Sequence, residues 1–144
     1  MKILVSDLLD VKGAKVVTID PDATIYDSVK TLMRHNIGAL LVEEEGQPLG
    51  ILSERDCRRM ILDDKNPHKV TVRELKSTVK RTVAPDDSLE DCMLMMTEHR
   101  IRHLPVVSKG KLAGIVSIGD VVKKLYEERS REVENLEKYI TGSL

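Results

Sequence analysis

An internal repeat constrains the fold of this 144-residue chain more than any other feature. When the sequence is compared with itself at a shift of 64 residues, 13 of the 39 positions from 18 to 56 are identical, without a gap. The identical pairs include Gly50 with Gly114, Ser53 with Ser117, and Asp56 with Asp120. A repeat of this length usually means that each copy is one supersecondary unit that cannot bury its apolar face alone. We therefore expect the two copies to share one core.

Each copy predicts the same order of elements. Residues 14–20 form a short extended segment, and residues 21–36 place apolar side chains at helical spacing behind turn and capping residues. Two apolar runs, 38–46 and 47–53, are separated by a polar turn that contains glycine, which indicates a hairpin. A second helix follows Ser53. The predicted order is β-α-β-β-α, twice, in the α+β class.

Two further helices are predicted outside this pattern. The segment 71–76 begins with Thr71 and has Glu74 at capping-box spacing, which indicates a short helix that leads into the second copy. Residues 120–140 indicate one long charged helix. Its thin apolar stripe consists of Val122, Tyr126, Val133, Leu136 and Ile140. Such a helix must pack against something, either its own domain or a second subunit.

The composition favours a soluble cytosolic protein. Charged residues make up 33% of the chain and the net charge is -1, so no overall field attracts nucleic acid or a membrane surface. Aromatic residues are only 2%, which argues against stacking platforms for nucleic acid. No apolar run approaches the length of a signal peptide or a spanning helix. The two cysteines, Cys57 and Cys92, lack CxxC spacing and are expected to be reduced.

The repeated S-x-x-D pattern has two interpretations. The serine can cap the following helix while the aspartate reaches back to the serine N–H, and a single instance would favour this reading. However, both instances follow a strand and open a helix whose N–H groups could face an anion. Each also has a glycine three residues before the serine, where backbone could approach a ligand. The aspartates could instead bind a ribose diol, and the two roles compete for one side chain.

On these motifs the chain resembles CBS domains, named after cystathionine β-synthase. The resemblance extends from about residue 4 to 125. It rests on "HNIGALLV" and "HRIRHLPVV" at the helix-to-strand turns and on "GILSERD" and "GIVSIGD" after the third strands. It implies two β-α-β-β-α repeats related by a pseudo-twofold axis and packed as one module, plus a C-terminal helix. We expect repeat 1 in residues 1–64, repeat 2 in 65–126 and a helical tail in 127–144.

The resemblance also implies two clefts that bind AMP or a related adenosine nucleotide (ATP, ADP or NAD/NADH), without a metal. One cleft would combine Ser117 and Asp120 with Val17, Thr18, Ile37, Gly38 and Ala39. The other would combine Ser53, Arg55 and Asp56 with Arg81, Thr82, Ile101, Arg102 and His103.

The two predicted clefts are not equivalent. Gly38 and Ala39 leave room for a flat base, whereas Arg102 and His103 are long and basic. Arg55 is matched by Gly119 in the other copy, so we expect unequal affinities. The chain also departs from the family pattern. Lys76 and Ser77 stand where the family often has Met-Thr, and the approach to the first repeat is longer.

Other candidate sites are poorer. His99 and His103 are four residues apart, but the helix should end near Arg100, so a zinc site is disfavoured. Cys57 could be a thiolate helped by Arg58, although a buried small residue is the better interpretation. No phosphate-binding loop, Rossmann turn or nucleophile-base pair occurs in the sequence.

The sequence therefore predicts a cytoplasmic, homodimeric CBS pair that senses adenosine nucleotides and regulates an unidentified protein. No catalytic residue is expected. The alternative is a structural interaction module whose clefts hold no ligand and which mediates dimerisation or partner binding. A nucleotide-dependent rise in melting temperature separates the two.

Overall fold

The computed structural model describes residues 2–12 and 16–142. The chain divides into two compact units, and each contains segments that are distant in sequence. Unit 1 consists of Met1–Ala14, Val83–Leu104 and Val116–Leu144. Unit 2 consists of Lys15–Thr82 and Pro105–Ile115.

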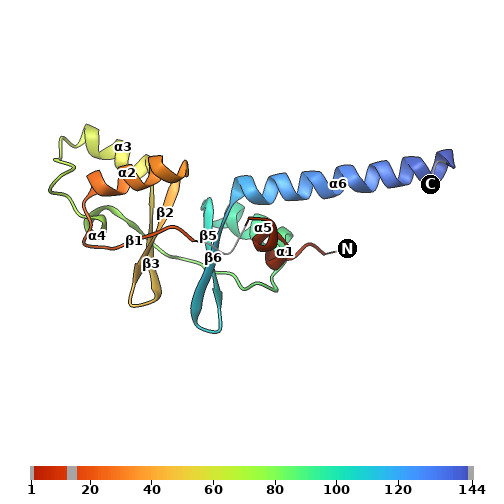
Figure 1. Ribbon diagram of the computed structural model, residues 1–144, viewed down its shortest axis with the longest axis horizontal. Helices are drawn as coiled ribbons and strands as arrows, with labels where there is room; N and C mark the ends of the chain where they lie inside the picture. The colour runs from red at the N-terminus through yellow and green to blue at the C-terminus, as the bar shows by residue number, and fades with distance from the viewer. Residues whose placement is uncertain (1, 13–15, 143–144) are drawn as a thin grey trace. The chain divides into compact units, whose positions relative to one another are not determined.

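Unit 2 contains a four-stranded sheet in the order β1-β2-β3-β4 (Figure 1). The strands are β1 (Thr18–Ile19), β2 (Ala39–Glu44), β3 (Gln47–Ser53) and β4 (Ser77–Thr78). Strand β1 pairs with β2 in parallel, and the other two pairings are antiparallel. The predicted hairpin of the first copy is therefore confirmed.

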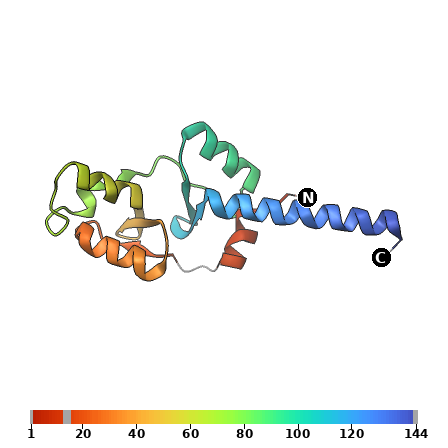
Figure 2. The same ribbon diagram turned by 90° about the horizontal axis from the view of Figure 1, so that it is seen from above.

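Three helices complete unit 2: α2 (Ile25–His35), α3 (Glu54–Leu62) and α4 (Val72–Leu75). Figures 1 and 2 show α2 and α3 on the same side of the sheet. Local signals fix α2, since the Thr24 side chain accepts from the N–H of Asp27 and Asn36 ends the helix in the left-handed conformation. The core between helices and sheet consists of Ile25, Val42, Leu52, Met60, Val70 and Val72.

The short helix α4 is confirmed, but its predicted capping box is wrong. Thr71 makes no side-chain cap hydrogen bond. Instead, the N–H of Val72 donates to the carbonyl of Ala23 at 2.9 Å, and the N–H of Arg73 donates to the carbonyl of Pro21 at 2.8 Å. The first N–H groups of α4 are thus satisfied by the loop before α2, which leaves the Thr71 hydroxyl no capping role.

Unit 1 contains α1 (Val5–Lys12), α5 (Leu89–His99) and α6 (Ile118–Thr141). Helix α1 was not predicted from the sequence. Its start is held by the segment before α5: Val5 N–H donates to the Asp87 carbonyl at 2.8 Å, and Leu89 N–H donates to the Ile3 carbonyl at 2.9 Å. Because a helix of eight residues is marginal alone, these tertiary contacts decide its formation.

The second hairpin, β5 (His103–Ser108) with β6 (Lys111–Ser117), is also confirmed. In the described residues no strand of two or more residues precedes it as β1 precedes β2, and at the corresponding positions only Val83, the counterpart of Ile19, forms a β-bridge. In the first copy the N–H of Leu41 donates to the carbonyl of Val17 at 3.4 Å. Pro105 occupies the position of Leu41 in the second copy and has no N–H to donate. The β-α-β-β-α order is therefore only partly realised in that copy.

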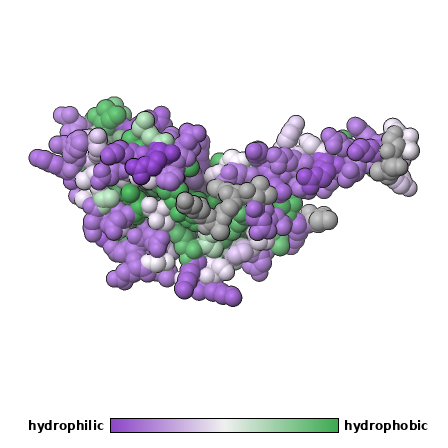
Figure 3. Space-filling model, viewed as in Figure 1, coloured by the Kyte–Doolittle hydropathy of each residue, from purple (hydrophilic) through white to green (hydrophobic). Residues whose placement is uncertain are grey.

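Helix α6 is longer than the others, with 24 residues. Figure 2 shows it continuing well beyond α1 and α5 of the same unit. Val121 in its first part is fully buried, whereas every residue from 131 to 142 is exposed. The face of α6 seen in Figure 3 is mostly hydrophilic.

Candidate functional site

The start of α3 is closed by a reciprocal pair of hydrogen bonds. The N–H of Asp56 donates to Ser53 Oγ at 3.3 Å, and the N–H of Ser53 donates to Asp56 Oδ2 at 2.9 Å. The Ser53 hydroxyl also donates to Oδ2 at 3.0 Å. This is a capping box, in which two otherwise unsatisfied donors are paired.

The start of α6 repeats this arrangement. The N–H of Asp120 donates to Ser117 Oγ at 3.1 Å, and the N–H of Ser117 donates to Asp120 Oδ2 at 3.2 Å. Both S-x-x-D motifs therefore cap their helices. The cap interpretation of the motif is correct in both copies.

Capping does not use the whole carboxylate of Asp56. All hydrogen bonds that the described residues make to it go to Oδ2. A carboxylate has two acceptor oxygens, so Oδ1 retains its capacity for a hydroxyl group. Capping through Oδ2 therefore does not by itself exclude a second hydrogen bond at Oδ1 of Asp56.

The two helix-to-strand turns are linked to these helix starts within each copy. The N–H of Glu54 donates to the carbonyl of Gly38 at 3.0 Å. In the other copy, the N–H of Ile118 donates to the carbonyl of Arg102 at 2.9 Å. Ala39 is also the strand partner of Ser53. Each turn is therefore held against the S-x-x-D motif of its own repeat.

Gly50 has a structural explanation. A Cβ built on it would lie 2.3 Å from the carbonyl oxygen of Ser77, because β4 passes directly against β3 at this point. The expectation that this glycine admits a ligand is wrong for the first copy. What approaches Gly50 is the backbone of β4.

The predicted site residues differ in exposure. Five are exposed: Gly38, Arg55, Arg81, Thr82 and Arg102. Ala39 is buried, and the remaining nine are half-buried: Val17, Thr18, Ile37, Ser53, Asp56, Ile101, His103, Ser117 and Asp120. The structure brings Ser53, Asp56, Gly38 and Ala39 together, as it does Ser117, Asp120 and Arg102. The grouping of the fifteen residues into two clefts stays a prediction.

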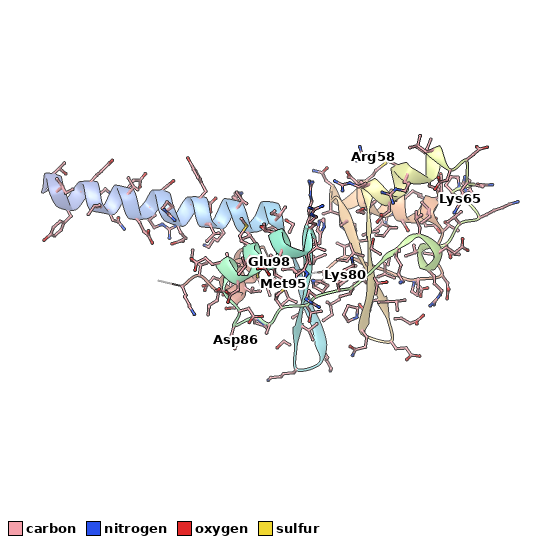
Figure 4. All side chains as sticks on the ribbon, turned by 180° about the vertical axis from the view of Figure 1, so that it is seen from behind. Arg58, Lys65, Lys80, Asp86, Met95 and Glu98 are labelled. Carbon is pink, nitrogen blue, oxygen red and sulfur yellow. The ribbon has the colours of Figure 1, made fainter. Side chains whose placement is uncertain are left out.

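One basic feature of α3 was not predicted from the sequence. A shallow hollow on this helix is lined by Arg55, Arg58, Arg59 and Leu62. Their spacing of three and four residues places them on one helix face, which was the available signal. Figure 4 shows Arg58 on α3 and Lys65 beyond the C-terminal end of that helix. The first turn of α3 carries the cation Arg55 between the carboxylates Glu54 and Asp56, whereas the first turn of α6 carries Asp120 and no cation.

Neither cysteine is an activated thiolate. Burial raises the pKa of Cys57, and the neighbouring Asp56 and Glu54 carboxylates raise it further. Burial likewise raises the pKa of Cys92 to about 11, with smaller contributions from Asp87 and Asp91. The idea that Arg58 helps a Cys57 thiolate is wrong, because burial and, after it, the acidic neighbours raise the pKa of this thiol.

The described residues contain no group of three or more His, Cys, Asp and Glu side chains arranged to hold a metal ion. Helix α5 ends at His99 and Arg100 is left-handed, as the sequence indicated. None of the helices in this part of the chain is long and apolar enough to cross a membrane.

Two α+β repeats, each with a capped helix start beside a helix-to-strand turn, define a tandem module. The sequence profile of the CBS domain matches residues 5–63 and 72–127, and the chain belongs to the CBS domain family. Among its relatives, the mitochondrial CBS domain-containing protein CBSX3 of Arabidopsis thaliana is 34% identical, over 96% of this chain and 72% of that protein.

Solved structures agree with this family. The crystal structure of a CBS-domain containing protein from Agrobacterium tumefaciens is 39% identical, with a TM-score of 0.78 over 85% of this chain and 98% of that one. A CBS domain protein from Pyrobaculum aerophilum, complexed with AMP, is 27% identical. Its TM-score is 0.74, over 82% of this chain and 89% of that chain.

Proposed function

We propose that this chain is a regulatory module that binds AMP or a related adenosine nucleotide (ADP, ATP or an NAD-type dinucleotide). The observation that carries the proposal is the repeated helix start, where the capping box holds a serine and an aspartate beside a turn. At the start of α3, Asp56 Oδ1 can accept a hydroxyl group of ribose. The AMP complex of the Pyrobaculum aerophilum relative supports the choice of ligand.

Phosphate recognition follows from the charges near the helix starts. The positive end of the α3 dipole and the exposed guanidinium of Arg55 favour an anion, and they act against the Glu54 and Asp56 carboxylates of the same turn. In the second copy Gly119 offers no such charge. Arg102 is nevertheless close to this helix start, because its carbonyl accepts a hydrogen bond from the N–H of Ile118. Because the two helix starts differ in this way, we propose two binding events of unequal affinity.

The proposed output is regulatory. Bound nucleotide would favour one state of the module by its differential contacts, and a cytoplasmic homodimer would pass this change to a regulated protein. No residue is assigned a catalytic step in this proposal.

A thermal unfolding panel tests the proposal. AMP, ADP, ATP and NAD are compared with CMP and GMP, which carry the same phosphate and ribose on other bases. A ligand at 100 times its Kd stabilises the native state by about 2.7 kcal/mol, and about 3 °C of melting temperature is expected for each kcal/mol. If no adenosine nucleotide raises the melting temperature above the CMP control, the proposal is wrong.

A second candidate is a ligand-free interaction module. The capping boxes favour this candidate, because Oδ2 of Asp56 and Oδ2 of Asp120 already accept a hydrogen bond from the N–H of Ser53 or Ser117 and have a structural role without any ligand. Under this candidate the chain has full stability without ligand, and the nucleotide panel leaves the melting temperature unchanged.

A charge-matched pair of variants locates the phosphate. Arg55→Gln removes the cation in the first turn of α3 and should weaken the tighter AMP event about tenfold, as expected for loss of one charge-assisted hydrogen bond. Lys65→Gln removes the same charge beyond the C-terminal end of α3 (Figure 4) and should leave both events unchanged.

A further inference from the structure

The exposed apolar stripe of α6 follows a heptad pattern. Its members, with Arg129 added, are separated alternately by four and three residues: Val122, Tyr126, Arg129, Val133, Leu136 and Ile140. The five apolar side chains are between 49% and 73% exposed. An average spacing of 3.5 residues is the seam of a two-stranded, left-handed coiled coil.

A different face of α6 packs on its own unit. Val121 is fully buried, and Lys124 and Glu128 are partly buried and form an ion pair at 3.5 Å. With about 3.6 residues per turn, the heptad seam lies about a quarter of a turn away from this packed face. The seam is therefore open along its length in the described part of the chain.

We propose that the occupant of this seam is α6 of a second copy of the chain, in antiparallel orientation. In the heptad, Tyr126, Val133 and Ile140 occupy a positions, and Val122, Arg129 and Leu136 occupy d positions. In an antiparallel pair each a position faces a d position of the other copy across a twofold axis, so the same surface of both copies forms the contact. The expected layers pair Val122 with Ile140, Tyr126 with Leu136, and Arg129 with Val133 of the second copy.

Charge along α6 favours the antiparallel arrangement. Residues 123–131 contain four basic and two acidic side chains, whereas residues 132–141 contain three acidic and one basic. Antiparallel pairing places the basic half of one helix beside the acidic half of the other. It also opposes the two helix dipoles, which parallel pairing would align.

The positions that flank the seam point the same way. Antiparallel pairing brings Lys123 beside Glu137 of the second copy and Leu125 beside Tyr139. It also brings Glu132 beside Glu132 of the second copy, which is a single contact between like charges at the centre of the pairing.

Parallel pairing would instead stack Arg129 on its own copy inside the seam and bring Glu132 near Glu137. Both are contacts between like charges, which disfavour that orientation.

The length of helix over which the two copies of α6 overlap determines the strength of the pairing. Residues 122–140 span about 28 Å at 1.5 Å per residue, which is fewer than three heptads. A coiled coil this short is marginal alone. We therefore expect reversible pairing that depends on protein concentration and weakens as salt screens the charges.

Cross-linking of two full-length variants tests both the pairing and its orientation. One chain carries Tyr126→Cys and the other Leu136→Cys, both with Cys57→Ser, and they are mixed in equal amounts with oxidised glutathione. Antiparallel pairing predicts a disulfide-linked heterodimer. In an antiparallel pair, residue 136 of one copy would lie about 15 Å along the axis from residue 136 of the other, which is too far for a disulfide. The Leu136→Cys chain should therefore form no disulfide-linked homodimer.

Tyr126 and Leu136 are exposed and Cys57 is half-buried, and circular dichroism checks that each chain remains folded. Asn135→Cys, on the outer face of α6, is the matched control. Linked homodimers of each variant would show parallel pairing and overturn the proposed orientation. No linkage above the Asn135→Cys control would overturn the proposal itself.

A charge variant provides a second readout. Adding Glu137→Lys to the Leu136→Cys chain places a positive charge beside Lys123 of the second copy, and should slow heterodimer formation several-fold. Glu134→Lys makes the same charge change on the outer face and should leave the rate unchanged. Equal rates for the two would contradict the antiparallel register.

Discussion

Gly50 lies directly against Ser77, since a Cβ at Gly50 would be 2.3 Å from the Ser77 carbonyl oxygen and 2.6 Å from the Lys76 side chain. Gly50→Ala must therefore push β4 away from β3. We expect a loss of about 2 kcal/mol in the free energy of unfolding, as for an overpacked core position. Urea denaturation monitored by circular dichroism measures it.

Gly38→Ala is the matched control for this substitution. The nearest heavy atom to its added Cβ would be Glu54 Cδ at 4.0 Å, which is an ordinary contact. We expect a change within about 0.5 kcal/mol. Equal effects of the two alanines would show that β4 does not constrain Gly50.

The serine caps should contribute measurably to stability. Ser53→Ala removes the acceptor for the Asp56 N–H, and Ser117→Ala removes the acceptor for the Asp120 N–H. Each should cost about 1 kcal/mol in thermal or urea unfolding. Thr71→Ala is the comparison, because Thr71 is also an N-cap but makes no side-chain cap bond, and its loss should cost much less.

Cys92 should be nearly inert to alkylation in the folded protein. With a pKa of about 11, only about one thiol in a thousand is ionised at pH 8. Mass spectrometry after iodoacetamide treatment should find Cys57 modified slowly, and Cys92 only after unfolding in urea. Fast modification of Cys92 in the native protein would contradict its burial.

The same thiol predicts a dependence of stability on alkaline pH. Its pKa in the folded protein is raised above the ordinary 9.0, so the folded state binds the proton more tightly than the unfolded state. The contribution is fully present below pH 9 and is lost as pH rises through about 11. Cys92→Ala should flatten this part of the unfolding profile relative to Cys57→Ala, whose thiol is only half-buried.

The repeat made most of the fold predictable. Helices α2, α3, α5 and α6 and both hairpins follow from periodicity and turn residues. In the second copy the first strand is reduced to the single bridged residue Val83. A comparison that treats the two copies as equal could not predict this, because it ignores that Pro105 lacks the N–H that Leu41 donates to Val17. Helix α1 was missed because contacts near Leu89, distant in sequence, hold it.

The candidate site was predictable in its residues but not in its bonding. Spacing alone located Ser53 and Asp56, yet only the structure shows that capping uses Oδ2 of that aspartate. Similarly, the sequence located Gly50 but gave no sign that β4 would lie against it. Both depend on which groups meet in space, and short-range patterns carry no such information.

Calorimetric titration of the full chain with AMP tests the central proposal most directly. We predict two binding events of different affinity, with the tighter one weakened about tenfold by Arg55→Gln and unchanged by Lys65→Gln. Two identical events would contradict the inequality argued from Arg55 and Gly119. The absence of any binding by AMP, ADP, ATP or NAD would contradict the proposed function.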